Sequence, residues 1–95
     1  MSRIQPRHYT DTLEHCLLNN KWMKSDYSII PIPDMHTIHL VNSINICNTK
    51  PEARGEYTPH FKTLLHRELL TRDEQEVQEA KATALRREMM RNTGD

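Results

Sequence analysis

The most concentrated run of apolar residues along the chain lies between positions 32 and 50, in the segment IPDMHTIHLVNSINICNTK. Its apolar side chains recur at spacings of three and four, which places them on one face of a helix: Leu40, Val41, Ile44 and Cys47. Asp34 stands just before this pattern, and its carboxylate suits the N-cap and the positive end of the helix dipole. The pattern predicts a central core helix that begins near Asp34.

Similar spacings predict a helix on each side of the central one. A short N-terminal helix should begin at Thr10 or Asp11, where Glu14 completes a capping box, and end at Asn19-Asn20. A later helix should begin at Thr58-Pro59, because proline at the first helical position loses no amide donor. Its buried face comprises Phe61, Leu64, Leu65, Leu69 and Leu70.

Residues 21 to 32 are enriched in aromatic and β-branched side chains around Ser25-Asp26, and this composition predicts a β-hairpin. No glycine follows Asp26, so a tight two-residue turn is disfavoured and a longer or irregular loop is the alternative. Pro31 and Pro33 cannot donate ladder hydrogen bonds, so the second strand should be short or lie at an edge.

The segment from 72 to 92 contains no proline or glycine, and Thr71 to Glu74 form a second capping box. Its acidic residues cluster near the start and its arginines near the end, which complements the helix dipole. Two thin apolar stripes run along it: Val77, Ala80 and Ala84 form one, and Ala82, Leu85 and Met89 form the other. We expect a long C-terminal helix that gains little from its own domain, and that meets a partner or a second copy or remains solvated.

These elements predict an α+β, mainly helical fold, in which a short β-hairpin packs on two core helices and a long C-terminal helix follows. The expected organisation is a flexible basic arm at 1–9, a small globular domain at 10–71, the C-terminal helix at 72–92 and a disordered end at 93–95. A chain of 95 residues supports one compact core and no deep active-site cleft.

Composition narrows the function further. Thirteen basic and thirteen acidic side chains cancel, so the chain lacks the overall positive field typical of nucleic-acid or anionic-membrane binding. Cys16 and Cys47 lie inside amphipathic segments and are expected to be buried free thiols in a reducing cytosol. No apolar run approaches the ~20 residues of a membrane span, and the N-terminus lacks a signal peptide's apolar region. We expect a soluble protein without a membrane partner.

Catalytic and metal-binding chemistry find little support in the pattern. His36, His39 and Cys47, with His15 and Cys16, supply zinc-ligand types, but a straight helix separates His39 from Cys47 by roughly 12 Å. With two glycines the chain cannot build a glycine-rich phosphate loop, and it shows no nucleophile elbow. The sequence predicts no enzyme, no metal site and no other cofactor.

Two surfaces are candidates for binding a macromolecule. The C-terminal helix offers the partner-binding residues Val77, Leu85, Arg86, Met89 and Met90, whose methionines suit an adaptable interface. Nucleic-acid contacts could come from Arg3, Arg7, Lys21, Trp22 and Lys24, with the arginines and lysines on phosphate and the indole stacked on a base. The zero net charge makes nucleic acid the second choice, with Trp22 in the core as the alternative interpretation.

The middle of the chain resembles a pattern found in small, uncharacterised bacteriophage proteins, in which a tryptophan-containing hairpin precedes two helices. The matching residues are Trp22; then Met35, His39, Leu40, Asn42 and Ile44; then Phe61, Leu64, Leu65, Glu68, Leu69 and Arg72. The chain departs from this pattern in two places. Tyr27 replaces the glycine that follows the aspartate in the pattern, and Phe61 stands where tyrosine is commoner.

The resemblance implies only a viral origin, and it offers no catalytic residues to carry over. We expect a location in the host cytoplasm. The leading hypothesis is a non-enzymatic phage accessory protein that takes part in host takeover by binding a host or viral protein, such as a defence, nuclease or transcription enzyme, and inhibiting or modulating it. The alternatives are a small nucleic-acid-binding protein and a structural protein that self-assembles as a homo-oligomer through the C-terminal helix.

Overall fold

The computed structural model describes the backbone of residues 6–93 and the side chains of residues 10–90. Along the chain it contains α1 (Pro6–Leu18), β1 (Lys21–Met23), β2 (Ile29–Pro31), the 3-10 turn η1 (Ile32–Asp34), α2 (Thr37–Thr49), the 3-10 turn η2 (Gly55–Tyr57), α3 (Thr58–Leu69) and α4 (Glu74–Thr93). Helices dominate, and the two strands pair as one antiparallel hairpin. The predicted α+β, mainly helical fold is confirmed.

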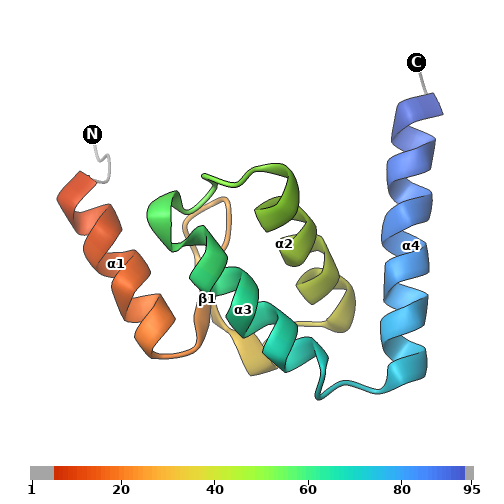
Figure 1. Ribbon diagram of the computed structural model, residues 1–95, viewed down its shortest axis with the longest axis horizontal. Helices are drawn as coiled ribbons and strands as arrows, with labels where there is room; N and C mark the ends of the chain where they lie inside the picture. Colours follow the sequence, from red (N-terminus) through yellow and green to blue (C-terminus); the bar gives the residue numbers. More distant parts are fainter. Residues whose placement is uncertain (1–5, 94–95) are drawn as a thin grey trace.

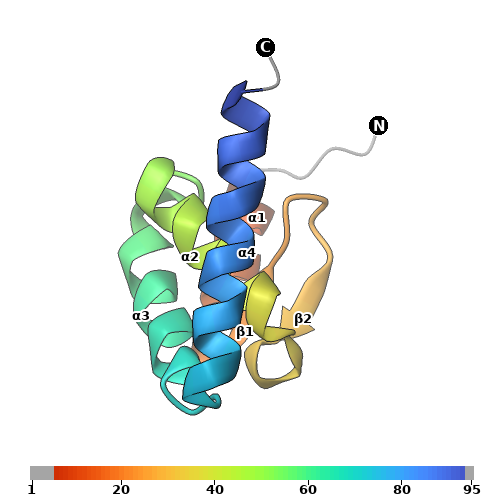
Figure 2. The same ribbon diagram turned by 90° about the vertical axis from the view of Figure 1, so that its right-hand side faces the viewer.

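The helix α2 is the centre of the arrangement. It packs against α3 on one side and against α4 on the other, while α1 packs on β1 at the far end (Figure 1). Seen from the side, α4 runs in front of the other elements, and no other helix or strand of the described residues lies over its outer side (Figure 2). The interpretation of the 32–50 segment as the central core helix is therefore confirmed.

Its predicted N-cap is wrong by two residues. Ile32–Asp34 form a separate 3-10 turn, in which the Met35 amide donates to the Ile32 carbonyl at 3.1 Å. The helix proper begins at Thr37, with His36 as an N-cap that makes no side-chain capping bond. Asp34 thus lies in a turn before the helix instead of at its N-cap.

The first helix also begins earlier than its sequence signal indicated. It starts at Pro6, about one turn before Thr10 and Asp11, because proline at a first helical position loses no donor. Residues 6–9, predicted as part of a flexible arm, belong to this helix, whereas residues 1–5 lie outside the described part of the chain. The predicted end is confirmed: Asn19 donates its amide to the His15 carbonyl, and Asn20 adopts a φ of 56°.

The hairpin is confirmed, and its loop is the irregular kind. Trp22 pairs with Ile30, and the loop closes through the Lys24 amide, which donates to the Ser28 carbonyl at 2.8 Å. Tyr27, where the resembling proteins carry glycine, adopts a φ of 71°, in the left-handed region that favours glycine. Asp26 accepts the Ser28 hydroxyl and amide, and these bonds lower the pKa of its carboxyl.

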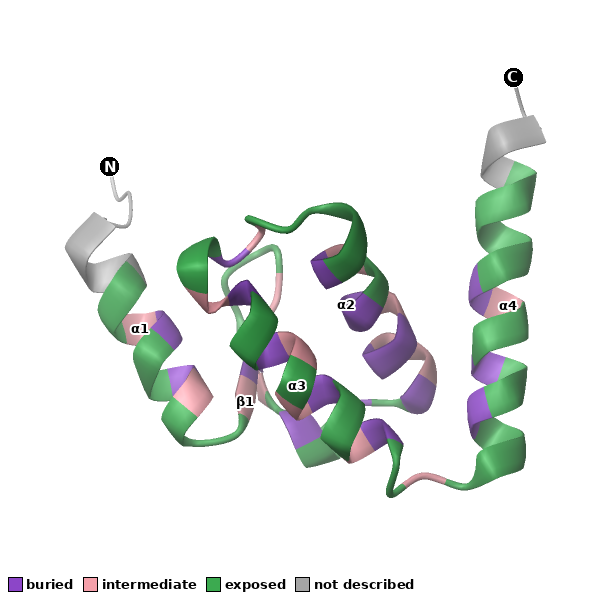
Figure 3. Ribbon diagram, in the orientation of Figure 1, coloured by how far each residue is buried: buried purple, intermediate pink, exposed green. Residues whose placement is uncertain are grey.

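The core lies between the hairpin, α2 and α3. The Trp22 and Phe61 rings meet edge to face, with 5.7 Å between their centroids and 80° between their planes. Around them lie the largest fully buried side chains: Leu13, Met23, Ile32, Met35, Leu40 and Leu65. Figure 3 colours the buried positions of α2 and α3 purple and shows fewer of them along α4.

The buried stripe on α4 corrects the expectation that this helix gains little from its own domain. Val77, Ala80 and Ala84 are buried on the side of α4 that packs against α2 (Figure 3). Asp73 caps the helix, because its Oδ2 accepts the Glu76 amide at 3.1 Å. The helix therefore belongs to the core along its first three turns.

A polar network holds the start of α4 in place. Arg72 forms an ion pair with Glu68 at 3.0 Å and donates to the Thr37 hydroxyl at 3.1 Å and to the Pro33 carbonyl at 3.3 Å. The Thr37 hydroxyl in turn donates to the Glu76 carboxylate. Because these groups come from α3, α2 and α4, the network fixes how α4 is rotated about its own axis.

Candidate functional site

The outward side of α4 carries large apolar side chains that its own domain leaves uncovered. Leu85, Met89 and Met90 are 59%, 57% and 67% exposed. We call these three residues the exposed α4 face. The small residues of the helix, Ala80 and Ala84, occupy the side that approaches α2, and Leu85 lies at the edge of that side.

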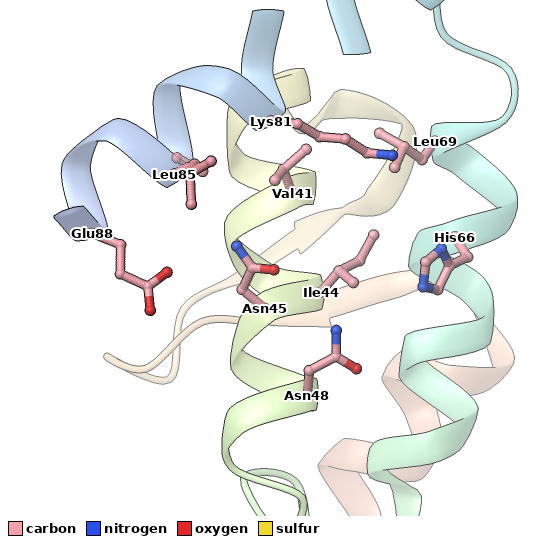
Figure 4. A pocket seen from close by; sticks show the side chains of 10 residues that line it. Val41, Ile44, Asn45, Asn48, His66, Leu69, Lys81, Leu85 and Glu88 are labelled. Carbon is pink, nitrogen blue, oxygen red and sulfur yellow. The ribbon is translucent and has the colours of Figure 1, made fainter. Parts of the chain in front are cut away.

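A groove of about 340 Å³ lies beside this face, between α2, α3 and α4. Figure 4 shows the side chains that line it: Val41, Ile44, Asn45, Asn48, His66, Leu69, Lys81, Leu85 and Glu88, to which Ala84 also contributes. Apolar side chains come from all three helices, and amide, imidazole and charged groups surround them. The volume is near the lower end for small-molecule sites.

The exposed α4 face differs from the other exposed apolar side chains of the described region. Leu18, Tyr27, Ile29 and Leu70 are also exposed, but they lie on different elements. Single exposed apolar side chains are normal on protein surfaces, whereas several on one helix, with Leu85 and Met89 one turn apart, are typical of an interaction site.

Four of the five predicted partner-binding residues are exposed on α4: Leu85, Arg86, Met89 and Met90. Val77 is the exception and corrects the prediction, because it is buried on the side of the helix that packs against α2. Its place is in the core of the domain.

The predicted nucleic-acid contacts do not assemble into one surface within the described residues. Trp22 is only 2% exposed, and its ring is covered by Phe61 and by the Arg54 guanidinium, 4.3 Å from the ring centroid. Stacking a base on this indole would require the hairpin to leave the core, which corrects its assignment as a contact. Lys21 and Lys24 are half-buried beside it. Arg3 and the side chain of Arg7 lie outside the described residues.

Arg54 is a structural residue that the pattern of the sequence did not reveal. It is buried, and its Nε and Nη2 donate to the Met23 carbonyl at 3.0 and 2.6 Å. Its Nη1 donates to the Ala53 carbonyl at 3.0 Å. With the indole below it, the guanidinium is held by carbonyls and a π face instead of a carboxylate. In the sequence it is one of several charged residues of a loop, so no local signal distinguishes it.

The two cysteines are buried free thiols, as the sequence predicts. Burial raises the pKa of Cys16, an effect that Lys21 partly offsets. Burial also raises the pKa of Cys47, with Arg54 and Lys62 opposing it. A buried thiol whose pKa is raised stays protonated at neutral pH and is a poor nucleophile. Among the described residues, no three His, Cys, Asp or Glu side chains gather closely enough to hold a metal ion.

A further tertiary hydrogen bond connects α1 to η2. The Tyr57 hydroxyl donates to a Glu14 carboxylate oxygen at 2.6 Å, and this bond is the main cause that raises the pKa of Tyr57 to about 12. The tyrosine therefore remains a neutral donor, and the pair secures the position of α1.

Comparison of the chain with protein-family models, curated proteins and solved structures finds no match. The resemblance to small phage proteins consequently remains a prediction from the sequence. Within residues 6–93, no helix has the length and apolar character needed to cross a membrane.

Proposed function

We propose that this chain is a non-enzymatic phage accessory protein that acts in the host cytoplasm by binding a host or viral protein through the exposed α4 face, and so inhibits or modulates that protein. The observation that supports the proposal is the grouping of Leu85, Met89 and Met90, each more than half exposed, on one helix. Covering these side chains would remove apolar surface from water, and this burial would stabilise the complex by about 25 cal/mol for each Å².

The support beneath this face also favours a binding role. The capped and clamped start of α4 holds the helix against α2, so a partner would meet a preformed surface and lose little entropy in ordering it. Methionine side chains adapt to irregular partner surfaces, and Arg86 beside them suits the polar rim of an interface. The matching partner surface is apolar with acidic groups at its edge.

The proposal is tested by replacing Leu85→Asp together with Met89→Asp and repeating affinity capture of the tagged chain from nuclease-treated host lysate. The double variant should lose a partner that the unchanged chain captures stoichiometrically, because two buried carboxylates would face an apolar surface. Its melting temperature should shift by no more than about 2 °C, because both positions are exposed.

Leu18→Asp is the matched control, since Leu18 is 85% exposed but lies on α1, at the opposite end of the molecule (Figure 1). It should leave both capture and melting temperature unchanged. Capture that survives in the double variant would refute the proposal. A large fall in melting temperature would show that the exposed α4 face belongs to the core.

Nucleic acid remains a rival partner, although the burial of Trp22 argues against this alternative. Repeating the capture without nuclease distinguishes a nucleic-acid partner from a protein partner. Recovery of nucleic acid without a protein, with binding that weakens steeply as salt rises, would favour the nucleic-acid role over the proposed one.

A further inference from the structure

Along the outer side of α4, five positions follow the alternating spacing of three and four residues that defines a coiled-coil seam. They are Gln75, Gln78, Ala82, Leu85 and Met89, and all five are exposed. At 3.6 residues per turn, this row lies nearly opposite the buried stripe that contacts α2. We call these five residues the outer seam. One side of α4 therefore serves the domain while the other remains available along its length (Figure 2).

Charged residues of alternating sign border the outer seam. Glu79 and Arg86 each follow a seam residue by one position and lie on one flank, while Lys81 and Glu88 each precede a seam residue and lie on the other. All four side chains are exposed. None of them forms an ion pair with another part of residues 10–90, although Lys81 and Glu88 also line the groove beside α2 and α3 (Figure 4).

The order of these charges selects one orientation for two copies of the helix. When two such helices run antiparallel, like flanks meet, so Glu79 faces Arg86 of the second copy on one side. On the other side, Lys81 faces Glu88 of the second copy. In the same register, Leu85 lies opposite Ala82 and Met89 lies opposite Gln78. The two-fold axis repeats each contact, and both the Glu79–Arg86 and the Lys81–Glu88 pairs have opposite charges.

A parallel pair would bring unlike flanks together and would be repulsive. Each residue of the Lys81 flank would then face the residue five positions later on the second copy. Lys81 would face Arg86, and Glu74 would face Glu79. The same charges that complement each other in the antiparallel pair oppose each other in the parallel one.

We propose that the outer seam of α4 binds a second copy of this chain in the antiparallel orientation, forming a two-fold symmetric dimer. The proposal goes beyond the proposed function: both use Leu85 and Met89, so a second copy of this chain and another protein would compete for these two side chains. Its apolar layers are few, since Gln75 and Gln78 occupy the N-terminal half of the seam. The interface is therefore small, and we expect a dissociation constant on the order of 10 µM.

The test is reversal of the flanking charges, with sedimentation equilibrium as the measurement. Glu79→Lys alone, or Arg86→Glu alone, should raise the dimer dissociation constant by about tenfold, because each creates two like-charge contacts where two ion pairs stood. The combined variant carrying both reversals should return the dissociation constant to within about threefold of its original value, because the pairs re-form with their signs exchanged.

A matched control reverses charges away from α4, with Glu52→Lys and Arg67→Glu, both of which are exposed residues. These variants should dimerise as the unchanged chain does. In a parallel dimer the outcome would invert, since Glu79→Lys would place a lysine against Glu74 and tighten association. A tighter dimer in either single variant, or no rescue in the combined one, would overturn the antiparallel geometry.

Failure of the dimer and failure of the proposed function give different results. A chain that stays monomeric at about 500 µM, well above the expected dissociation constant, would overturn the dimer. If that monomer still captures another protein in a manner that Leu85→Asp with Met89→Asp abolishes, the proposed function stands. If it captures nothing, both proposals are refuted.

Discussion

The middle of the molecule and its last helix use hydrophobic residues in opposite ways. In the hairpin and α3, the largest side chains are the most buried: Trp22 and Phe61 are packed edge to face. In α4 the small Ala80 and Ala84 are buried, and Leu85 and Met89 are exposed. The middle gains its stability from aromatic packing, whereas α4 is attached by a narrow stripe, a cap and a polar network.

This difference teaches where a function can lie. A residue that is large, apolar and buried is explained by the stability it provides. A residue that is large, apolar and exposed on a well-anchored helix has no such explanation, and an interaction surface supplies one. Three substitutions measure the contrast, from the largest expected effect to the smallest.

Phe61→Ala should have the largest effect. It removes a fully buried ring and its contact with Trp22, so the free energy of unfolding should fall by about 3–5 kcal/mol. Urea denaturation followed by circular dichroism measures this change. Leu70→Ala is the control, because Leu70 is the most exposed large hydrophobic residue of the described region, and it should cost less than about 0.5 kcal/mol. Equal costs at the two positions would contradict this assignment of the core.

Arg54→Met should rank second. The thioether side chain can occupy much of the same space but leaves the buried Met23 carbonyl without its two guanidinium donors and removes the cation over the indole. We expect a loss of about 2–3 kcal/mol in unfolding free energy. The exposed Arg67→Met provides the control and should change stability by less than about 0.5 kcal/mol. If both substitutions were neutral, the structural role given to Arg54 would be wrong.

Asp73→Ala should have the smallest of the three effects, and it tests how α4 is anchored. Loss of the bond between its carboxylate and the Glu76 amide should cost about 1 kcal/mol. Asp34→Ala is the sharpest comparison, because a carboxylate predicted to cap α2 instead lies in the preceding turn, and its loss should cost less than about 0.5 kcal/mol. The melting temperature of the Asp73→Ala variant should therefore be the lower of the two. A lower melting temperature for Asp34→Ala would show that Asp34 is the true cap.

The sequence by itself determined which kinds of element form and which segment lies at the centre. The spacing of Leu40, Val41, Ile44 and Cys47 made a central helix predictable, and the β-branched composition around Ser25-Asp26 made a hairpin predictable. Such signals are local, because periodicity and turn chemistry act within a few residues. The ends of helices were less predictable, since the residues at 6–9 and 32–36 can adopt more than one local structure.

The tertiary structure alone decided which of two similar stripes on α4 turns inward. By apolar content, the stripe with Leu85 and Met89 is at least as strong a candidate for the core as the one with Val77, and no pattern along the chain separates them. Small side chains allow α2 and α4 to approach closely, and the Arg72, Thr37 and Glu76 network fixes the rotation of the helix. These contacts join residues more than thirty positions apart. Their geometry exists only once the chain has folded, and it is this geometry that leaves the exposed α4 face for a partner.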